Sequence, residues 1–255
     1  MMKIDFHIHV KLSKKVSFSP EYFQTMISEA RQEGLQAITM TEHFNTLRFN
    51  DIYDELDRSY PYRNHYYDVD GFKVFPGMEV DVAEGGHILV IGPRESIRSI
   101  HGKLTGHMTD DSFMPFDRLM TMCSEHEMLM IGAHPFRSSN SLQLLSQQQL
   151  SQLDAVDLNA KDLRTYGVEA MHSQMKEYAA QAALPLVGGS DTHHPLQVGS
   201  IVNTLGRTCD TIADLKRCIK EGDYSVAISP CLPIKVRAAD DIKQLLQAEL
   251  LRQSV

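Results

Sequence analysis

The sequence lacks the cysteine patterns that mark sulfur-based sites. Its cysteines are few and scattered, at Cys123, Cys209, Cys218 and Cys231, and no two of them form a Cys-x-x-Cys pair. Neither a zinc ribbon nor a thioredoxin-type motif is therefore present. The chain contains 12 histidines, so we expect any bound metal to be held by nitrogen and oxygen atoms rather than by sulfur.

An excess of positive charge is also missing. The 25 Lys and Arg residues against 33 Asp and Glu residues give a formal net charge of −8. Such a chain has no diffuse basic field of the kind that holds a nucleic-acid backbone. A nucleic-acid substrate therefore has no support from overall charge, although a local basic or metal-charged pocket is compatible with the composition.

Long apolar runs are absent as well. No run approaches the length that spans a membrane, and the first residues contain charges and two histidines where a secretory signal needs an unbroken apolar core. We therefore expect a cytoplasmic protein without a membrane partner. Repeats and low-complexity tracts are missing too, and 255 residues fit a single α/β barrel, so we expect one domain over residues 1–255.

Stretches typical of strands and helices alternate along the chain. A helix is predicted after Ser19, because Ser19 suits the cap position, Pro20 the first turn and Gly34 the end. Further helices are predicted within residues 116–127 and 173–183, and strands at 35–40, 73–80, 87–92, 128–134, 168–171 and 185–191. This alternation predicts a parallel α/β sheet or barrel.

Two regions interrupt the alternation. Residues 44–70 are polar and rich in tyrosine, and we interpret them either as an insertion that acts as a lid or substrate wall, or as a surface excursion without a role. Residues 93–114 are predicted to form another long connection, whose histidines are assigned no role. Glu169 and His172, near the end of the predicted strand 168–171, are candidates to line a pocket.

The stretch DFHIHV at residues 5–10 places two histidines in an otherwise apolar segment. Side chains of a strand alternate between its two faces, so Asp5, His7 and His9 share one face. An edge strand whose histidines meet water would show the same pattern, and a strand whose histidines chelate a metal would show it too. The ends of the other predicted strands bear on this choice.

Ligand-type side chains recur where the predicted strands end: His7 and His9, the Glu42–His43 pair, Glu79, His134, and Asp191 with His193. His87 begins a strand instead, and reaches the same end if an antiparallel hairpin around residues 83–86 precedes it. Carboxyl ends of parallel strands converge in a barrel. Any one of these histidines is compatible with an ordinary structural role, but burying so many ionisable groups together requires a charged partner. A divalent ion meets this need, and the donor set suits zinc, manganese or iron.

Together these motifs resemble those of the polymerase and histidinol phosphatase (PHP) family of metal-dependent phosphoesterases. The matching pieces are DFHIHV, TEH, GMEVDVAEGGHILVIG, AHP and GSDTHH, in that order from residue 5 to residue 194. The resemblance implies a distorted (β/α)7 barrel with two or three divalent metal ions. It also implies the ligands: one ion on His7, His9, Glu79 and Asp191, a second on the bridging Glu79 with His87 and His134, and a third at His43 and His193.

One position departs from the family pattern. The family usually places Asp or His five residues after the histidine pair, as part of the third metal site, and Lys14 stands there in this chain. A protonated lysine cannot ligate a cation. Either the third ion is absent and Lys14 offers its charge to a substrate phosphate, or a different residue completes the site, or Lys14 points to solvent. Arg137, which follows AHPF, is a phosphate-binding candidate or an ordinary surface arginine.

These expectations predict an enzyme, a metal-dependent phosphatase or phosphodiesterase in which a hydroxide bridging two ions attacks phosphorus. The catalytic candidates that grip the phosphate are His43, His193, Lys14 and Arg137, and one of the two histidines is a candidate to protonate the leaving oxygen. A small phosphorylated substrate is expected. The alternatives are a metallohydrolase of a carbon–nitrogen bond and a noncatalytic, metal-containing binding module.

Overall fold

The computed structural model describes residues 1–139 and 141–253. Its framework is one sheet in which neighbouring strands follow the order β11-β10-β1-β2-β5-β6-β7-β8-β9. These strands are β1 (Met2–Ile8), β2 (Ala37–Met40), β5 (Phe72–Asp81), β6 (His87–Ile91), β7 (Leu129–Ala133), β8 (Ala155–Asn159), β9 (Leu186–Gly189), β10 (Ile201–Leu205) and β11 (Tyr224–Ile228). Two short strands, β3 (Tyr62–Arg63) and β4 (Tyr66–Val69), lie off this path, and β4 pairs with β5.

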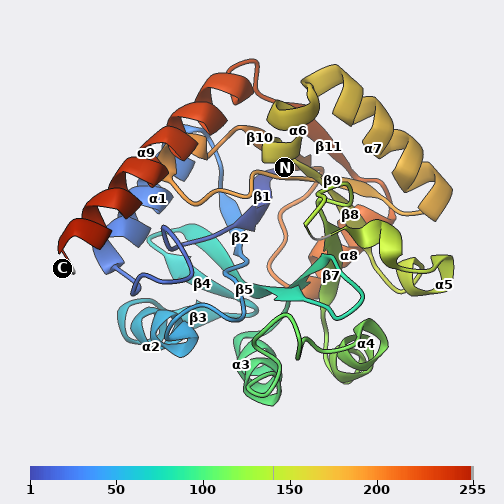
Figure 1. Ribbon diagram of the computed structural model, residues 1–255, viewed down its shortest axis with the longest axis horizontal. Helices are drawn as coiled ribbons and strands as arrows, with labels where there is room; N and C mark the ends of the chain where they lie inside the picture. Colours follow the sequence, from blue (N-terminus) through green and yellow to red (C-terminus); the bar gives the residue numbers. More distant parts are fainter. Residues whose placement is uncertain (140, 254–255) are drawn as a thin grey trace.

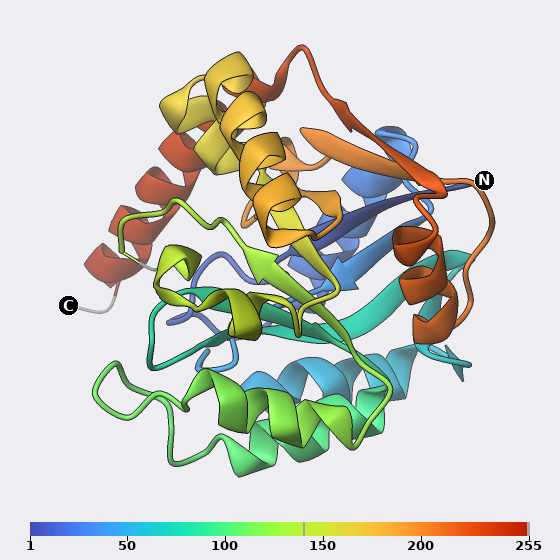
Figure 2. The same cartoon turned by 90° about the vertical axis from the view of Figure 1, so that its right-hand side faces the viewer.

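The sheet curls until β9 approaches β1. The backbone N–H of Asp191 donates to the His7 carbonyl over 2.8 Å, and the N–H of His9 donates to the Thr192 carbonyl over 2.9 Å. The nearly closed ring therefore contains the seven strands from β1 to β9 in the sheet order, while β10 and β11 continue the sheet beyond β1 (Figures 1 and 2). The predicted fold class, a distorted β/α barrel in a single domain, is confirmed.

Helices surround the barrel (Figure 1). They are α1 (Pro20–Gln32), α2 (Phe49–Ser59), α3 (Arg94–Lys103), α4 (Phe116–Ser124), α5 (Gln147–Leu150), α6 (Ala160–Tyr166), α7 (Val168–Ala182), α8 (Ile212–Lys220) and α9 (Leu232–Gln253), with 3-10 turns η1 (Leu142–Leu144) and η2 (Pro195–Gln197). The long α9 packs against α6 and η2. Within the described ranges, no helix combines the length and apolar character needed to cross a bilayer.

The first helix forms as its sequence predicts. The Ser19 hydroxyl accepts a hydrogen bond from the backbone N–H of Tyr22 over 3.1 Å, which caps the helix start. The buried face consists of Phe23, Met26, Ile27 and Ala30, at helical spacing. Gly34 follows the helix with a φ of 78°, a left-handed conformation that glycine adopts at little cost.

The sheet is mixed, which corrects the expectation of a parallel sheet. β6 runs antiparallel to both β5 and β7, so the predicted hairpin around residues 83–86 is confirmed. In this hairpin Asp81 lies opposite His87. The start of β6 therefore lies at the same end of the barrel as the carboxyl ends of its neighbours β5 and β7.

The predicted strand at residues 168–171 is wrong, because these residues begin α7. The buried residues of this helix recur at helical spacing, at Met171, Met175, Ala179 and Ala182, and four residues are too few to show that period. Glu169 and His172 thus lie on a helix rather than at a strand end, and Glu169 is exposed. The strand of this region is β8, which precedes α6.

The two interrupting regions contain more regular structure than expected. Residues 44–70 form α2, β3 and β4, and the buried face of α2 comprises Phe49, Ile52, Tyr53 and Leu56. These contacts anchor the segment to the barrel wall, and its role as a lid stays a prediction. Residues 93–114 contain α3, whose His101 ring stacks on Phe49 with centroids 4.0 Å apart.

Candidate metal centre

Histidine and carboxylate side chains gather at the end of the barrel where the parallel strands finish. All eight predicted metal ligands lie in this cluster: His7, His9, His43, Glu79, His87, His134, Asp191 and His193. Seven of them are buried, and only His43 is partly exposed. Residues far apart in the sequence thus converge, as expected for strand ends in a barrel.

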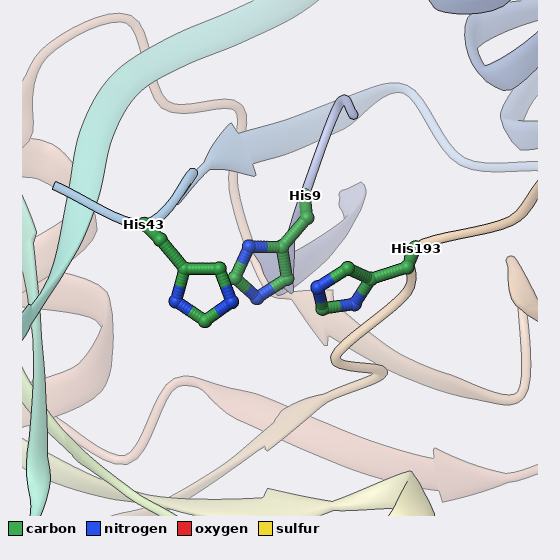
Figure 3. A group of neighbouring side chains, drawn as sticks. All are labelled: His9, His43 and His193. Carbon is green, nitrogen blue, oxygen red and sulfur yellow. The ribbon is translucent and has the colours of Figure 1, made fainter. Parts of the chain in front are cut away.

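Three sets of side chains in the cluster place their ligand atoms close enough together to hold a metal ion. Two of them share one carboxylate, and we call them the Glu79 groups: His7 with His9 and Glu79, and Glu79 with His87 and His134. The other is the three-histidine group of His9, His43 and His193. Figure 3 shows these three rings turned toward one another from three separate segments of the chain.

Glu79 lies between the two Glu79 groups. Its Oε1 is 2.6 Å from His87 Nδ1 and 3.1 Å from His134 Nε2. Its Oε2 is 3.4 Å from His9 Nε2, and Asp191 Oδ1 lies at the same distance from that nitrogen. One carboxylate therefore faces both sets of nitrogens, which is the arrangement expected of a ligand that bridges two ions.

A hydrogen bond orients His7 for ligation. His7 Nδ1 lies 2.9 Å from Asp157 Oδ2, so the proton sits on Nδ1 and the lone pair of the neutral ring is on Nε2. That Nε2 faces His9 Nε2 at 3.2 Å. Two imidazole nitrogens at this distance need a proton or a cation between them, and carboxylate–histidine pairs of this kind are typical of metal sites.

Two further buried atoms also require a proton or a cation between them. Glu79 Oε2 and His43 Nδ1 are 2.8 Å apart, but their mutual orientation is not that of a hydrogen bond, and neither atom has another hydrogen-bond partner among the described residues. A buried polar atom without a partner costs about 1–3 kcal/mol. A cation between the two acceptors would satisfy both, so the residues present fit a divalent metal ion.

The electrostatics of the cluster also suit a cation. Burial raises the pKa of Glu79, but His87 and His43 outweigh it and hold that pKa well below its usual range. Burial opposes charge on His87, and the neighbouring Glu79 and Asp81 nevertheless raise its pKa to about 9. Burial and the neighbouring His9 lower the pKa of His43 to about 4. The buried negative charge thus draws protons onto selected neighbours, as it would draw metal ions.

The local backbone is shaped for the cluster. His134 has a φ of 32° and Asp191 a φ of 53°, a region that costs energy for residues other than glycine and is frequent at functional sites. Gly189, at the end of β9, permits a close approach. A Cβ there would lie 2.4 Å from Asp157 Oδ1 and 2.6 Å from His7 Cβ, so any larger residue would displace the His7–Asp157 pair.

Several side chains that contact the cluster lie outside the predicted ligand set. Asp81 Oδ1 is 2.7 Å from His87 Nε2, Asp157 orients His7, and Lys161 Nζ is 3.0 Å from Asp191 Oδ1. The stretch AVDLNAK at residues 155–161 contains a usable signal, because Asp157 and Asn159 alternate within a short apolar run. This is the same pattern of period two that marks the histidine pair of β1.

Lys14 borders the His87 side of the cluster. Its Nζ lies 3.7 Å from Asp81 Oδ2, and 38% of its side chain is exposed. It therefore does not point away into solvent, and its contact is with Asp81, which itself contacts His87. The ammonium group also contributes to lowering the pKa of His43.

Arg137 turns its N–H groups toward the protein. It donates to Asp162 over 2.9 Å, to Asp191 over 3.0 Å and to Asn159 over 3.1 Å. Burial raises the pKa of Asp191, but Lys161 and Arg137 outweigh it and hold that pKa well below its usual range. A guanidinium engaged in this way suits the positioning of Asp191 better than a direct contact with a phosphate.

The order of these ligands along the chain is matched by a known family. A family model described as PHP domain matches residues 5–229. The chain belongs to the PHP domain family. Membership of this family, together with the His and Glu groups, indicates a metal-dependent hydrolase.

Solved structures share this fold. PsfC from Pseudomonas syringae PB-5123 has a TM-score of 0.79 at 22% identity, over 96% of this chain and 98% of that one. The lesion-specific endonuclease PfuEndoQ from Pyrococcus furiosus has a TM-score of 0.62 at 20% identity, over 88% of this chain and 57% of that one. An amidohydrolase from Chromobacterium violaceum, with bound sulfate and no metal, has a TM-score of 0.54 at 15% identity, over 87% and 97%. No curated protein matches the sequence closely enough to count as a relative.

Proposed function

We propose that the protein hydrolyses phosphoesters with two divalent metal ions held by the Glu79 groups and Asp191. The observation that carries this proposal is the position of Glu79, one buried carboxylate that faces two sets of nitrogen ligands while lysine side chains border the cluster. Two such ions supply a water of lowered pKa as the nucleophile and neutralise charge on the phosphoryl oxygens. Imidazole and carboxylate donors suit manganese, zinc or iron.

The side chains of the chain itself hold and orient the phosphoryl group. Burial and the neighbouring His9 lower the pKa of both His43 and His193, so both imidazoles are neutral near pH 7. A neutral imidazole has one N–H donor, which suits a hydrogen bond to a phosphoryl oxygen better than transfer of a proton. Lys14 adds positive charge on the His87 side, where it stabilises negative charge that develops during the reaction.

The charge of the whole molecule favours a small substrate. Lys14, Lys161 and Arg137 bring positive charge to the cluster, while the formal net charge of the chain is −8. This net negative charge opposes the binding of a long nucleic-acid backbone, whereas a small phosphorylated molecule or a single nucleic-acid end would respond mainly to the charges close to the cluster. We therefore expect phosphatase activity on small molecules, in a cytoplasmic setting.

A substrate panel tests the proposal. Chelator-treated protein is reconstituted with manganese or zinc and assayed with 4-nitrophenyl phosphate, bis(4-nitrophenyl) phosphate and a set of amides. We expect release of 4-nitrophenol from a phosphate ester that requires added metal, and no amide cleavage. Amide cleavage without phosphoester cleavage would instead identify a carbon–nitrogen hydrolase. Tight metal binding without turnover of any compound would point to a binding module.

A further inference from the structure

The three-histidine group differs from the Glu79 groups because a lysine reaches it. Lys161 is the second residue of α6, the helix that follows β8 directly. Its Nζ lies 3.2 Å from His193 Nδ1 and 3.0 Å from Asp191 Oδ1. With 22% of its side chain exposed, this ammonium group is sheltered by the protein and still open to a small ligand.

The backbone holds Lys161 in this position. Asn159, the last residue of β8, caps α6 by accepting a hydrogen bond from the Lys161 N–H over 3.0 Å. The Asn159 side chain donates in turn to Asp157 Oδ2 over 3.1 Å, the same oxygen that orients His7. The segment that orients His7 therefore also fixes the main chain from which the Lys161 side chain reaches Asp191 and His193.

This contact limits what His193 can bind. An ammonium group has three donors and no acceptor, so Lys161 binds His193 Nδ1 only through the lone pair of that nitrogen. The Asp191 carbonyl oxygen lies 3.3 Å from the same nitrogen and, as an acceptor, favours a proton there instead. A metal ion on Nδ1 would need the lone pair that Lys161 uses. A metal ion in the three-histidine group and the ammonium of Lys161 therefore compete for the same ring.

We propose that Lys161 replaces a third metal ion: its ammonium occupies the cation position beside His193 and contacts an oxygen of the substrate phosphoryl group, while two ions bind at the Glu79 groups. The choice of phosphate as the anion rests on the proposed function. The number of metal ions does not depend on the proposed function. The replacement of a third ion by Lys161 and the hydrolysis of phosphoesters can therefore be disproved separately.

A second ammonium group supports an anionic ligand at this place. Lys243, on α9, is partly buried and forms no hydrogen bond or ion pair with another residue in the described part of the chain. Burial and the charge of Lys161 lower the pKa of Lys243 to about 8. The ion pair between Arg164 and Asp240, at 3.6 Å, joins α6 to α9 one helical turn from each lysine. Two like charges brought together are favourable when an anion lies between them.

Metal counts and phosphate binding test the inference on the full chain. The parent protein, Lys161→Gln, Lys161→Arg and the control Lys176→Gln, an exposed lysine on α7, are loaded with manganese and freed of excess metal. Ions per chain come from elemental analysis, their positions from anomalous scattering, and the dissociation constant of inorganic phosphate from calorimetry. Circular dichroism verifies that each variant is folded.

We expect two ions in the parent protein and no anomalous peak within bonding distance of His193. Lys161→Gln should raise the phosphate dissociation constant by about tenfold or more, the effect of losing a charged hydrogen bond, and should bind a third ion at raised manganese. Lys161→Arg should keep two ions and most of the phosphate affinity, and Lys176→Gln should match the parent.

Two results would overturn the inference. The first is a parent protein with a third ion on His193 and with Lys161 displaced, because the lysine would then only fill space in the metal-free chain. The second is a folded Lys161→Gln variant with unchanged phosphate affinity. If the substrate panel shows no phosphoester cleavage but the parent holds two ions and Lys161→Gln binds a third, the proposed function fails and the role of Lys161 as a cation substitute stands.

Discussion

The two sides of the cluster differ in the charges that the chain supplies. The Glu79 groups combine imidazoles with a buried carboxylate, and Asp191 adds a second carboxylate next to them. The three-histidine group contains imidazoles alone, and the ammonium of Lys161 contacts one of them. Negative charge therefore marks where cations are expected, and positive charge marks where an anion is expected. The following changes test this comparison, from the carboxylate that both Glu79 groups share to the lysines that border the cluster.

The largest effect is expected from Glu79→Gln. This change removes the charge that both Glu79 groups share, so both ions should bind weakly and activity should fall by more than about 100-fold, the upper range for residues that only support a metal ligand. Elemental analysis and steady-state kinetics measure the two effects. Glu177→Gln, on an exposed position of α7, is the control, and retention of two ions by Glu79→Gln would contradict the bridging role.

A smaller effect is expected from Asp157→Asn. The amide oxygen still accepts the hydrogen bond from His7 Nδ1, but it lacks the negative charge that strengthens this histidine as a ligand. Metal affinity should fall by about 10- to 100-fold, with the fold intact. Competition with a fluorescent chelator measures the affinity, and Asp111→Asn, at an exposed position, is the control. Unchanged affinity would mean that Asp157 stabilises the structure of β8 and β9 and does not support metal binding.

The gathering of the candidate ligands of the Glu79 groups is predictable from sequence because most of them stand near the end of a strand whose apolar pattern is easy to recognise, and His87 begins an antiparallel strand that starts at the same end of the barrel. His7 and His9 alternate with apolar residues, and His134 and Asp191 end strong apolar runs. The barrel topology then brings these ends together whatever their separation in the chain. The spacing of polar and apolar residues thus suffices to predict where a ligand-type side chain lies when it belongs to a regular strand.

The positively charged side chains at the cluster, Lys161 and Arg137, are harder to predict from sequence, because a lysine has no distinctive spacing and most lysines are solvated. Lys161 is recognised only once β8, which is short and contains two polar residues, is paired between β7 and β9. Arg137 shows the same limit: its place after AHPF is compatible with a phosphate contact, and only the tertiary structure shows its N–H groups directed at Asp162, Asp191 and Asn159.

The pH dependence of metal binding should reveal the protons that the metal-free Glu79 groups hold. Glu79 and Asp81 raise the pKa of His87 to about 9 against the effect of burial, and Glu79 and Asp191 raise the pKa of His7 in the same way. A ligand must lose its proton before it binds a metal. Near pH 7 both histidines are protonated, so the apparent affinity for the metal should rise with pH. The part of this rise that comes from His87 should end above about pH 9.

Calorimetry in buffers of different ionisation enthalpy counts the protons. With both histidines protonated, binding of manganese near pH 7 should release protons, and each released proton makes the affinity rise about tenfold per pH unit. Asp81→Asn should lower the pKa of His87 and so reduce the number released. An affinity that does not change between about pH 6 and pH 9 would show that these histidines are neutral before the metal arrives.

The smallest effect is expected at Lys14, and it separates the two lysines that border the cluster. Lys14 is 38% exposed and lies 3.7 Å from Asp81, and partly exposed ion pairs contribute about 0–1 kcal/mol. Lys14→Ala should therefore weaken phosphate binding by less than about fivefold and leave the metal count unchanged. Calorimetry with inorganic phosphate measures this change, and Lys15→Ala, the exposed neighbour, is the control.

Lys14→Asp sharpens the same comparison, because it places a carboxylate where the family usually has a ligand. If Lys161 holds the third cation position, this variant should still bind two ions, since His193 remains engaged with the ammonium of Lys161. A third ion in Lys14→Asp but not in Lys161→Gln would assign the position to Lys14 instead. A third ion only in the double variant would show that both lysines must leave before the three-histidine group accepts a metal.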